Sequence, residues 1–208
     1  MVVAGAALDE WRRRVAALDG AVFDGRALTL ADFQDWAEWE GTERWVRYAL
    51  EDAKVLIDRV GHLATMTAAK ARVPPGKATA FVAASLDHFV NQVYRCAKCV
   101  RDGDPFAGRL EAVEAVNPLL DALFALDAGR ARPYAKHLRW EIENRPPAGL
   151  PLTGAELLDL LTGVLSPSPL AALQVLVRRL EPHFRASGHG AVLDAWGATL
   201  PWIRGPCD

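Results

Sequence analysis

Two groups of charged side chains have the types and spacing that could bind or convert a ligand. The first group lies within roughly 80° of one face of the helix expected over residues 78–101 and comprises Asp87, Asn91, Arg95, Lys98 and Asp102. This face is either a solvated surface on which spaced charges pair or one wall of a cleft. In a cleft, Arg95 and Lys98 would bind an anion. The candidate ligand-binding residues here are Asn91, Tyr94, Arg95, Lys98 and Asp102.

The second group belongs to the helix expected from Arg132 to Asn144. One face of it carries Arg132, Lys136, Arg139 and Glu143, while His137 and Glu141 form an i, i+4 pair beside that face. Cations near the start of a helix oppose its macrodipole, and this local conflict favours an anionic partner. The partner is either a ligand, bound by Arg132 and Lys136, or the acidic side chains of the preceding helix, namely Glu111, Glu114 and Asp121.

Glu141 and His137 are the candidate catalytic residues of the second group. A carboxylate among several cations normally has a lowered pKa, so Glu141 would suit a general base better than a general acid. The spacing from Arg132 to His137 also fits the R-x4-H motif of HEPN-type ribonucleases. A chain this rich in arginine produces that spacing by chance, so the motif is weak.

The sequence completes neither a metal site nor a cofactor site. Cys96 and Cys99 have CxxC spacing, but they lie inside the expected helix, and no second pair of ligands completes a zinc site. Asp102 and Asp104 have the spacing of metal-binding carboxylates, but they flank a helix end and are predicted to be a turn residue and an N-cap. P-loop, GxGxxG, HExxH, GxSxG and EF-hand motifs are absent from the sequence. We expect no metal and no cofactor.

Composition narrows the class of protein. The 208 residues include 24 basic and 26 acidic side chains, for a net charge of −2, and 51% are hydrophobic. The chain can therefore bury a core, and a broad cationic surface for nucleic acid is not expected. No apolar run reaches the roughly 18–20 residues of a membrane span, and no signal peptide is evident. Three cysteines indicate a reducing compartment. We expect a cytoplasmic protein without membrane contact.

Helical periodicity dominates the chain, so we predict an all-α bundle of seven to nine helices. The expected helices cover residues 8–18, 42–60, 62–72, 78–101, 105–126, 132–144, a segment capped by Thr153, a segment opened by Ser166-Pro167, and 191–200, with a break or kink at Pro118. Residues 21–28, around Asp24-Gly25, have the pattern of a β-hairpin. Thr29 and Asp32 should cap a short helical turn.

The pattern of linkers suggests three parts. Residues 1–30 would form a helix and hairpin appendage, residues 31–145 the main bundle, and residues 152–208 a C-terminal lobe packed on it. The connector between the last two parts is the stretch Arg145-Pro-Pro-Ala-Gly149.

Several strings occur in an order that resembles a known family. They are Val22-Phe-Asp-Gly-Arg, Trp39-Glu-Gly-Thr-Glu-Arg-Trp-Val-Arg-Tyr, Val93-Tyr-Arg-Cys-Ala-Lys, Arg101-Asp-Gly, Leu123-Phe-Ala-Leu and Arg132-Pro-Tyr-Ala-Lys-His-Leu-Arg-Trp-Glu. Over residues 20–205 the chain resembles the helical C-terminal region of bacterial nucleotidyltransferase-domain proteins, of the kind that includes kanamycin nucleotidyltransferase. In that family the helical domain closes over the nucleotide and the acceptor substrate.

The resemblance implies a substrate-side cleft with Arg95, Lys98 and Asp102 on one wall and Arg132, Lys136 and Glu141 on the other. The family's catalytic N-terminal domain carries a Gly-Ser motif and a strand-borne Asp-x-Asp pair, and this sequence has neither. We therefore expect no metal-dependent nucleotidyl transfer by this chain alone.

The sequence thus predicts binding of a small polar or anionic ligand between the two charged groups. Two alternatives stay open: a small-molecule biosynthetic enzyme in which Glu141 or His137 transfers a proton, and an HEPN-type ribonuclease that uses Arg132 and His137 across a dimer. The expected partners are the small ligand and either a separate nucleotidyltransferase chain, docked at the hairpin near Asp24, or a second copy of the chain.

Overall fold

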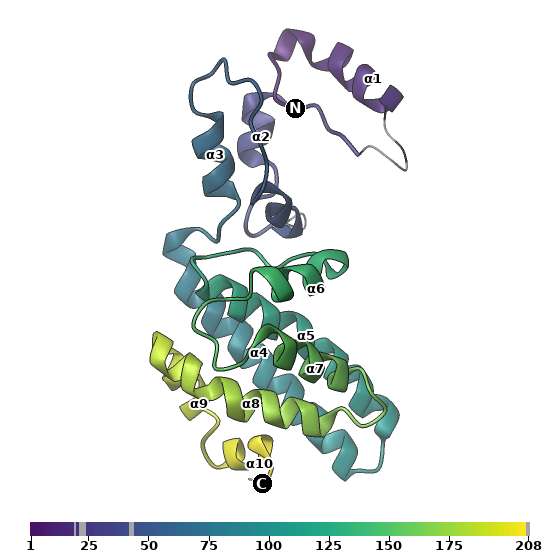
Figure 1. Ribbon diagram of the computed structural model, residues 1–208, viewed down its shortest axis with the longest axis vertical. Helices are drawn as coiled ribbons and strands as arrows, with labels where there is room; N and C mark the ends of the chain where they lie inside the picture. The colour runs from purple at the N-terminus through teal and green to yellow at the C-terminus, as the bar shows by residue number, and fades with distance from the viewer. Residues whose placement is uncertain (19, 21–23, 42–43, 207–208) are drawn as a thin grey trace. The chain divides into compact units, whose positions relative to one another are not determined.

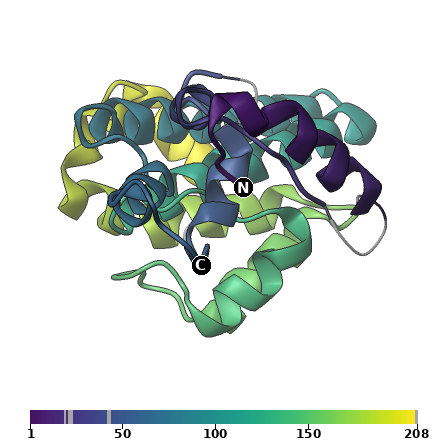
Figure 2. The same cartoon turned by 90° about the horizontal axis from the view of Figure 1, so that it is seen from above.

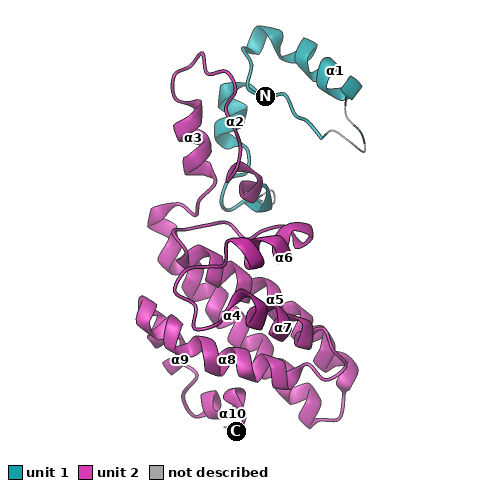
Figure 3. Ribbon diagram, viewed as in Figure 1, with its two compact units in different colours: residues 1–46 teal, residues 47–208 magenta. Residues whose placement is uncertain are grey.

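The computed structural model describes residues 1–18, 20, 24–41 and 44–206. Within these ranges the protein is all-α, with ten α-helices and no sheet, which confirms the expected fold class. The chain divides into two compact units, residues 1–46 and 47–208 (Figure 3). The helices after residue 152 belong to the same unit as residues 47–145, whereas the sequence suggested boundaries near residues 30 and 145.

The first unit contains the 3-10 turn η1 (Gly5–Ala7) and the helices α1 (Leu8–Leu18) and α2 (Leu30–Asp35). As expected, Thr29 caps α2: its hydroxyl accepts the N–H of Asp32 at 3.0 Å, and the Asp32 carboxylate accepts the N–H of Thr29 at 3.1 Å.

The expected hairpin is described only in part, because residues 21–23 lie outside the described residues. From residue 24 onward the backbone pairs with the N-terminus instead. Leu28 forms an isolated parallel bridge with Val2. The Leu28 N–H donates to the carbonyl of Met1 at 2.9 Å, and the Val3 N–H donates to the carbonyl of Leu28 at 2.8 Å.

The long helix expected over residues 42–60 is wrong. Thr42 lies outside the described residues, and the chain from there forms the 3-10 helix η2 (Arg44–Leu50) and then an irregular segment that ends at Gly61. This segment leaves apolar side chains in solvent, with Leu56 89% exposed. An amphipathic helix would have buried that side chain.

Tertiary contacts override helix propensity in this segment. Glu51 accepts a hydrogen bond from Arg72 at 2.6 Å, and Asp52 accepts one from Arg145 at 2.7 Å. Farther along, the Asp58 carboxylate accepts three backbone N–H groups at 2.7 to 2.9 Å and so closes a turn. The Asp58 turn is local, but the partners of Glu51 and Asp52 lie 21 and 93 positions away and are not visible in the local sequence pattern.

The second unit is built on a long helical hairpin. After α3 (Leu63–Lys70), α4 (Pro75–Arg101) runs the length of the unit and α5 (Pro105–Leu126) returns along it (Figure 1). The connecting turn forms as the sequence predicts, with Gly103 at a φ of 79° and Asp104 accepting the N–H of Ala107 at 2.9 Å. α4 begins at Pro75 rather than Ala78, because proline is favoured in the first turn.

Of the break or kink expected at Pro118, the break is absent. The helix continues through Pro118 to Leu126, and Pro118 itself is buried. Proline inside a helix costs about 3 kcal/mol, but the second half of α5 packs Leu119, Leu120 and Leu123 into the core, each at most 1% exposed. Burial of these side chains stabilises the helix enough to offset the lost hydrogen bond.

Three helices follow the hairpin: α6 (Ala135–Asn144), α7 (Gly154–Val164) and α8 (Leu170–Phe184) (Figure 1, and from above in Figure 2). α7 and α8 pack on the hairpin, and α6 packs on α7. Thr153 forms the expected capping box with Glu156. α6 begins three residues later than predicted from Arg132, and α8 likewise begins after Ser166-Pro167.

The C-terminal helix expected over residues 191–200 is divided. A π turn (Arg185–His189) leads to α9 (Gly190–Asp194), and a 3-10 turn (Gly197–Thr199) leads to α10 (Leu200–Arg204). Gly188 and Gly197 have φ angles of 87° and 49°, which L side chains rarely adopt, and these angles interrupt the helix.

The core of the second unit lies between the hairpin and the helices that follow it. Its largest fully buried side chains include Phe89, Phe124, Phe184, Leu119, Leu123, Ile142, Leu157 and Leu176. Among the described residues, none of the helices combines the length and the apolar character that a bilayer crossing requires.

A substitution at Gly154 tests the close contact between α6 and α7. A Cβ atom at this position would lie 2.3 Å from the carbonyl oxygen of Ile142, so Gly154→Ala should lower the free energy of unfolding by about 1–3 kcal/mol, although alanine is the better helix former. Urea denaturation measures the change. Gly76→Ala in α4 is the control, since nothing lies within 4 Å of its Cβ; an equal loss there would contradict the packing argument.

Candidate functional site

Glu141 of α6 is a carboxylate with no exposure to solvent (0%). Its oxygens accept hydrogen bonds from three side chains: the Tyr48 hydroxyl at 2.8 Å, Nη2 of Arg130 at 2.7 Å, and Nε of Arg145 at 3.1 Å, with Nη2 of Arg145 also bonded to it. Burial of an ionised carboxylate is costly unless it is paired and hydrogen-bonded. Glu141 meets both conditions, because Arg130 and Arg145 pair with its charge and three side chains donate hydrogen bonds to it.

Each arginine also binds a second acidic side chain. Arg145 donates to both oxygens of Asp52, at 3.0 and 2.7 Å. Arg130 donates to Asp127 at 2.9 Å and to the backbone carbonyl of Arg145 at 2.9 Å. We call this set the Glu141 hub, and its members are Tyr48, Asp52, Asp127, Arg130, Glu141 and Arg145.

The hub joins three segments of the chain, and the first of them is distant in sequence from the other two. Residues 48–52 cover the end of η2 and the two residues after it, residues 127–130 follow α5, and residues 141 and 145 belong to α6 and its C-cap. Next to it, the buried guanidinium of Arg47 donates to the carbonyls of Lys70 and Arg72 at 2.7 and 2.9 Å. The hub therefore positions the η2 segment against α6, and Arg47 holds it against the end of α3.

Environment shifts the pKa values of several hub groups. Burial, followed by the hydrogen bond to Glu141, raises the pKa of Tyr48 to about 12. The hydrogen bonds from Arg145 hold the pKa of Asp52 below its ordinary value, and the bonds to Asp52 and Glu141 raise the pKa of Arg145. Tyr48 thus stays protonated and Asp52 ionised at neutral pH.

An exposed surface lies over the hub at the start of α6. The ring of Tyr48 contacts Tyr134 edge-on, with centroids 5.1 Å apart, and His137 lies 5.8 Å from Tyr48 and 6.1 Å from Tyr134. Lys136 and His137 are exposed in the first turn of α6. We call Tyr48, Tyr134, Lys136 and His137 the α6 surface.

The start of α6 carries no negative charge of its own. Its first turn contains no acidic residue, and its N-cap, Tyr134, makes no side-chain capping hydrogen bond. Lys136 forms no ion pair with any residue in the described part of the chain. The predicted conflict with the helix macrodipole is therefore present at Lys136.

Two other cations of the predicted groups are neutralised by α5. Arg132 donates to Asp121 at 2.8 Å, and Arg95 makes a two-pronged pair with Glu111 at 2.8 and 2.6 Å. The acidic side chains of the preceding helix, the alternative that the sequence left open, thus supply both partners.

The structure does not bring the two predicted groups together. The partners of Arg95 and Arg132 on α5, Glu111 and Asp121, are ten positions apart, which corresponds to about 15 Å along a helix axis. Arg95 and Lys98 lie toward the turn between α4 and α5, whereas Arg132 follows the far end of α5. The cleft walled by both groups is not the arrangement found here.

The polar face of α4 is associated with aromatic side chains from the C-terminal helices. Tyr94 contacts Trp196 and Trp202, each with ring centroids 5.6 Å away, and Nζ of Lys98 lies 5.3 Å from the Tyr94 ring centroid. The indole N–H of Trp196 donates to Asp87 at 3.0 Å. Asn91 is half-buried one turn from Tyr94. These contacts fasten the C-terminal helices to α4.

The remaining predicted residues have local structural roles. Asp102 is the C-cap of α4 and pairs with Arg101 at 2.7 Å, and Asp104 caps α5. Cys96 is buried, and burial raises the pKa of its thiol to about 11, so it is a poor nucleophile at neutral pH. Within the described residues, no three His, Cys, Asp or Glu side chains are grouped closely enough to hold a metal ion.

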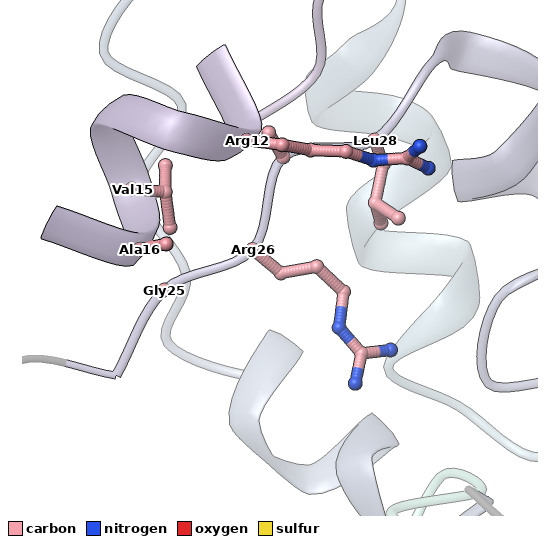
Figure 4. A pocket seen from close by; sticks show the side chains of 7 residues that line it. Arg12, Val15, Ala16, Gly25, Arg26 and Leu28 are labelled. Atoms are coloured by element: carbon pink, nitrogen blue, oxygen red, sulfur yellow. The ribbon is translucent and has the colours of Figure 1, made fainter. Parts of the chain in front are cut away.

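The first unit contains a cavity that sequence reasoning missed. It has a volume of about 330 Å³ and is lined by Arg12, Val15, Ala16, Gly25, Arg26, Ala27 and Leu28. Arg12 extends from α1 and Arg26 from the segment after Gly25 (Figure 4). Arg12 lies 3.9 Å from both Asp9 and Asp32, and Arg26 lies over the Trp36 ring, so other groups already engage both guanidinium groups.

No family model, no curated protein and no solved structure matches the chain. The geometry of its own residues therefore carries the functional argument.

Sequence reasoning also missed Tyr48, Arg130 and Arg145, the three donors to Glu141. Arg145 was detectable, because it follows Glu141 by four positions, which is pairing distance on a helix. Tyr48 was hidden by the wrong prediction of a helix through residues 42–60, and nothing local connects Arg130 to α6.

The raised pKa of Tyr48 gives a spectroscopic prediction. Since burial and the bond to Glu141 disfavour the phenolate, the ultraviolet titration of tyrosine should contain a component near pH 12 that is lost in Tyr48→Phe. The folded pKa lies above the unfolded one, so this contribution to stability is present below about pH 10 and is lost as the pH rises through about 12. A titration without the late component would contradict the burial of this hydroxyl.

Proposed function

We propose that this chain binds a small ligand that carries an anionic group, and that the ligand binds at the α6 surface. The observation that supports this most is Lys136: an exposed cation in the first turn of a helix, without an acidic partner in the described part of the chain. The first backbone N–H groups of α6 point toward the N-terminal end of the helix, and a helix N-terminus favours negative charge.

The aromatic side chains beside Lys136 supply the second part of the site. Tyr48, Tyr134 and His137 form one packed group of rings at the same surface. Such rings offer apolar contact area with polar atoms at their edges. A ligand with an anionic group next to a ring or another apolar part would contact both Lys136 and this group.

The Glu141 hub acts in this proposal as a positioning element. Glu141 fixes the Tyr48 hydroxyl at 2.8 Å and, through Arg145 and Asp52, fixes the segment that carries Tyr48. The carboxylate itself is buried, so a ligand at the surface does not reach it. Because the rings are already held in place before binding, less conformational entropy is lost when the ligand binds.

The resemblance to helical nucleotidyltransferase domains supports the same assignment, since the string Arg132-Pro-Tyr-Ala-Lys-His covers the α6 surface and the family uses its helical domain on the substrate side. The proposal keeps ligand binding from the sequence prediction, but it moves the site from a two-walled cleft to one end of α6.

Pyrophosphate titration followed by NMR tests the proposal. We expect saturable shifts of the amide signals of Tyr134, Lys136 and His137, and a dissociation constant that rises roughly fivefold or more in Lys136→Ala, as for the loss of a charge-assisted hydrogen bond. Lys54→Ala is the matched control, because Lys54 is an exposed lysine of the same unit outside this surface; its affinity should equal that of the unmodified protein.

Comparison with phenyl phosphate extends the same experiment to the rings. Tighter binding of phenyl phosphate than of inorganic phosphate, reduced in Tyr134→Ala, would support the aromatic contact. Shifts that avoid α6, or equal losses in Lys136→Ala and Lys54→Ala, would show that the anion binds elsewhere or without specificity.

A further inference from the structure

The first half of α5 presents a stripe of apolar side chains to solvent. Phe106, Leu110 and Val113 are 64%, 54% and 49% exposed. The other side of the helix packs on α4: a Cβ at Gly108 would lie 3.4 Å from Val100 and 3.7 Å from Cβ of Cys99. At about 100° per residue, Gly108 and Leu110 point in nearly opposite directions, so the stripe faces away from α4.

The same stripe is covered in the second half of the helix. Continued along α5, it includes Asn117, Leu120 and Phe124, and the last two are 1% and 0% exposed. α5 thus carries one apolar face along its length, which the unit itself buries only after Asn117. Burial of the second half shows that this face is suited to helix packing.

Opposite charges flank the exposed half of the stripe. Arg109 and Glu114 are both exposed, on opposite sides of Leu110 and Val113 when viewed along the helix axis. Neither forms an ion pair with any residue in the described ranges of the chain.

We propose that this stripe pairs with the same stripe of a second copy of the chain, with the two α5 helices parallel and in register. Leu110 takes position a of a heptad, Phe106 and Val113 take position d, and Arg109 and Glu114 take positions g and e. In a parallel pair, g of one helix meets the e residue five positions farther along the other. Arg109 of each copy therefore meets Glu114 of the second copy.

The charges select the parallel orientation. In an antiparallel pair g faces g and e faces e, which would place Arg109 against Arg109 and Glu114 against Glu114 of the second copy. Asn117 occupies the next a position and is exposed. A polar asparagine at a is the residue that fixes register in two-stranded parallel pairs.

The pair is expected to be weak. Stable interfaces bury roughly 800 Å² on each partner, and three side chains with two flanking ion pairs supply only part of that area. The dimer should therefore form reversibly and increase with protein concentration. It requires no ligand, so it is independent of the proposed function.

Sedimentation velocity over a concentration series up to the millimolar range tests the proposal. The unmodified protein should shift from monomer toward dimer, and Leu110→Asp should stay monomeric. Leu165→Asp is the matched control, because Leu165 is a leucine 68% exposed outside the stripe; its dimerisation should be unchanged. Circular dichroism confirms that both variants are folded.

The charge variants test the orientation. Arg109→Glu should raise the dissociation constant roughly three- to thirtyfold, since two exposed ion pairs are lost, and the double variant Arg109→Glu with Glu114→Arg should restore it. An antiparallel pair would leave Arg109→Glu unchanged and would overturn the orientation. A protein that stays monomeric throughout, or Leu110→Asp that dimerises like Leu165→Asp, would overturn the proposal.

Discussion

The second unit depends on one buried negative charge. Glu141 has no contact with solvent, and the free energy lost when its carboxylate leaves water is offset only because Tyr48, Arg130 and Arg145 all donate to it. Arg145 belongs to the C-cap of α6 itself, Arg130 follows α5, and Tyr48 is 93 positions away in the sequence. Satisfying the charge therefore requires η2, the end of α5 and α6 to meet in one arrangement. Such a requirement favours a single packing arrangement, whereas apolar contacts alone would allow several.

Function in this account follows from what the hub leaves exposed. Within the hub, Asp52 and Asp127 pair with Arg145 and Arg130. Lys136 is left on the surface of α6 without a carboxylate among the residues described. Tyr48 connects the Glu141 hub with the α6 surface, because its hydroxyl belongs to the hub and its ring belongs to the surface. Negative charge at the surface is thus supplied by a ligand rather than by the chain, in the proposal made above.

Local signals in the sequence predicted much of the fold. Thr29, Asp104 and Thr153 cap helices where expected, because a cap needs only a side chain and the next three residues. Errors arose where distant residues decide the outcome. The helix expected over residues 42–60 is replaced by contacts to Arg72 and Arg145, and Pro118 stays helical because the core packs around it. Hydrophobic periodicity reports only on local sequence, so it predicts neither the contacts to distant arginines nor the packing around Pro118.

The candidate site was predicted in part for the same reason. Lys136, His137 and Glu141 were found from their spacing on one helix, but the partners of Glu141 on other segments were not, so the sequence suggested proton transfer where the structure shows a buried ion pair. Arg95 and Arg132 lie far apart because their partners, Glu111 and Asp121, are at different positions along α5. A pattern within one helix does not reveal this separation.

The free energy of unfolding of Glu141→Gln, measured by urea denaturation against Glu143→Gln, tests the central claim most directly. Both changes remove one carboxylate charge from α6, but Glu143 is exposed and pairs with Arg139 at 3.4 Å. We expect a loss of about 3 kcal/mol or more for Glu141→Gln, because two arginines lose a buried partner, and less than about 0.5 kcal/mol for Glu143→Gln. Equal, small losses in the two variants would show that the fold does not depend on the Glu141 hub.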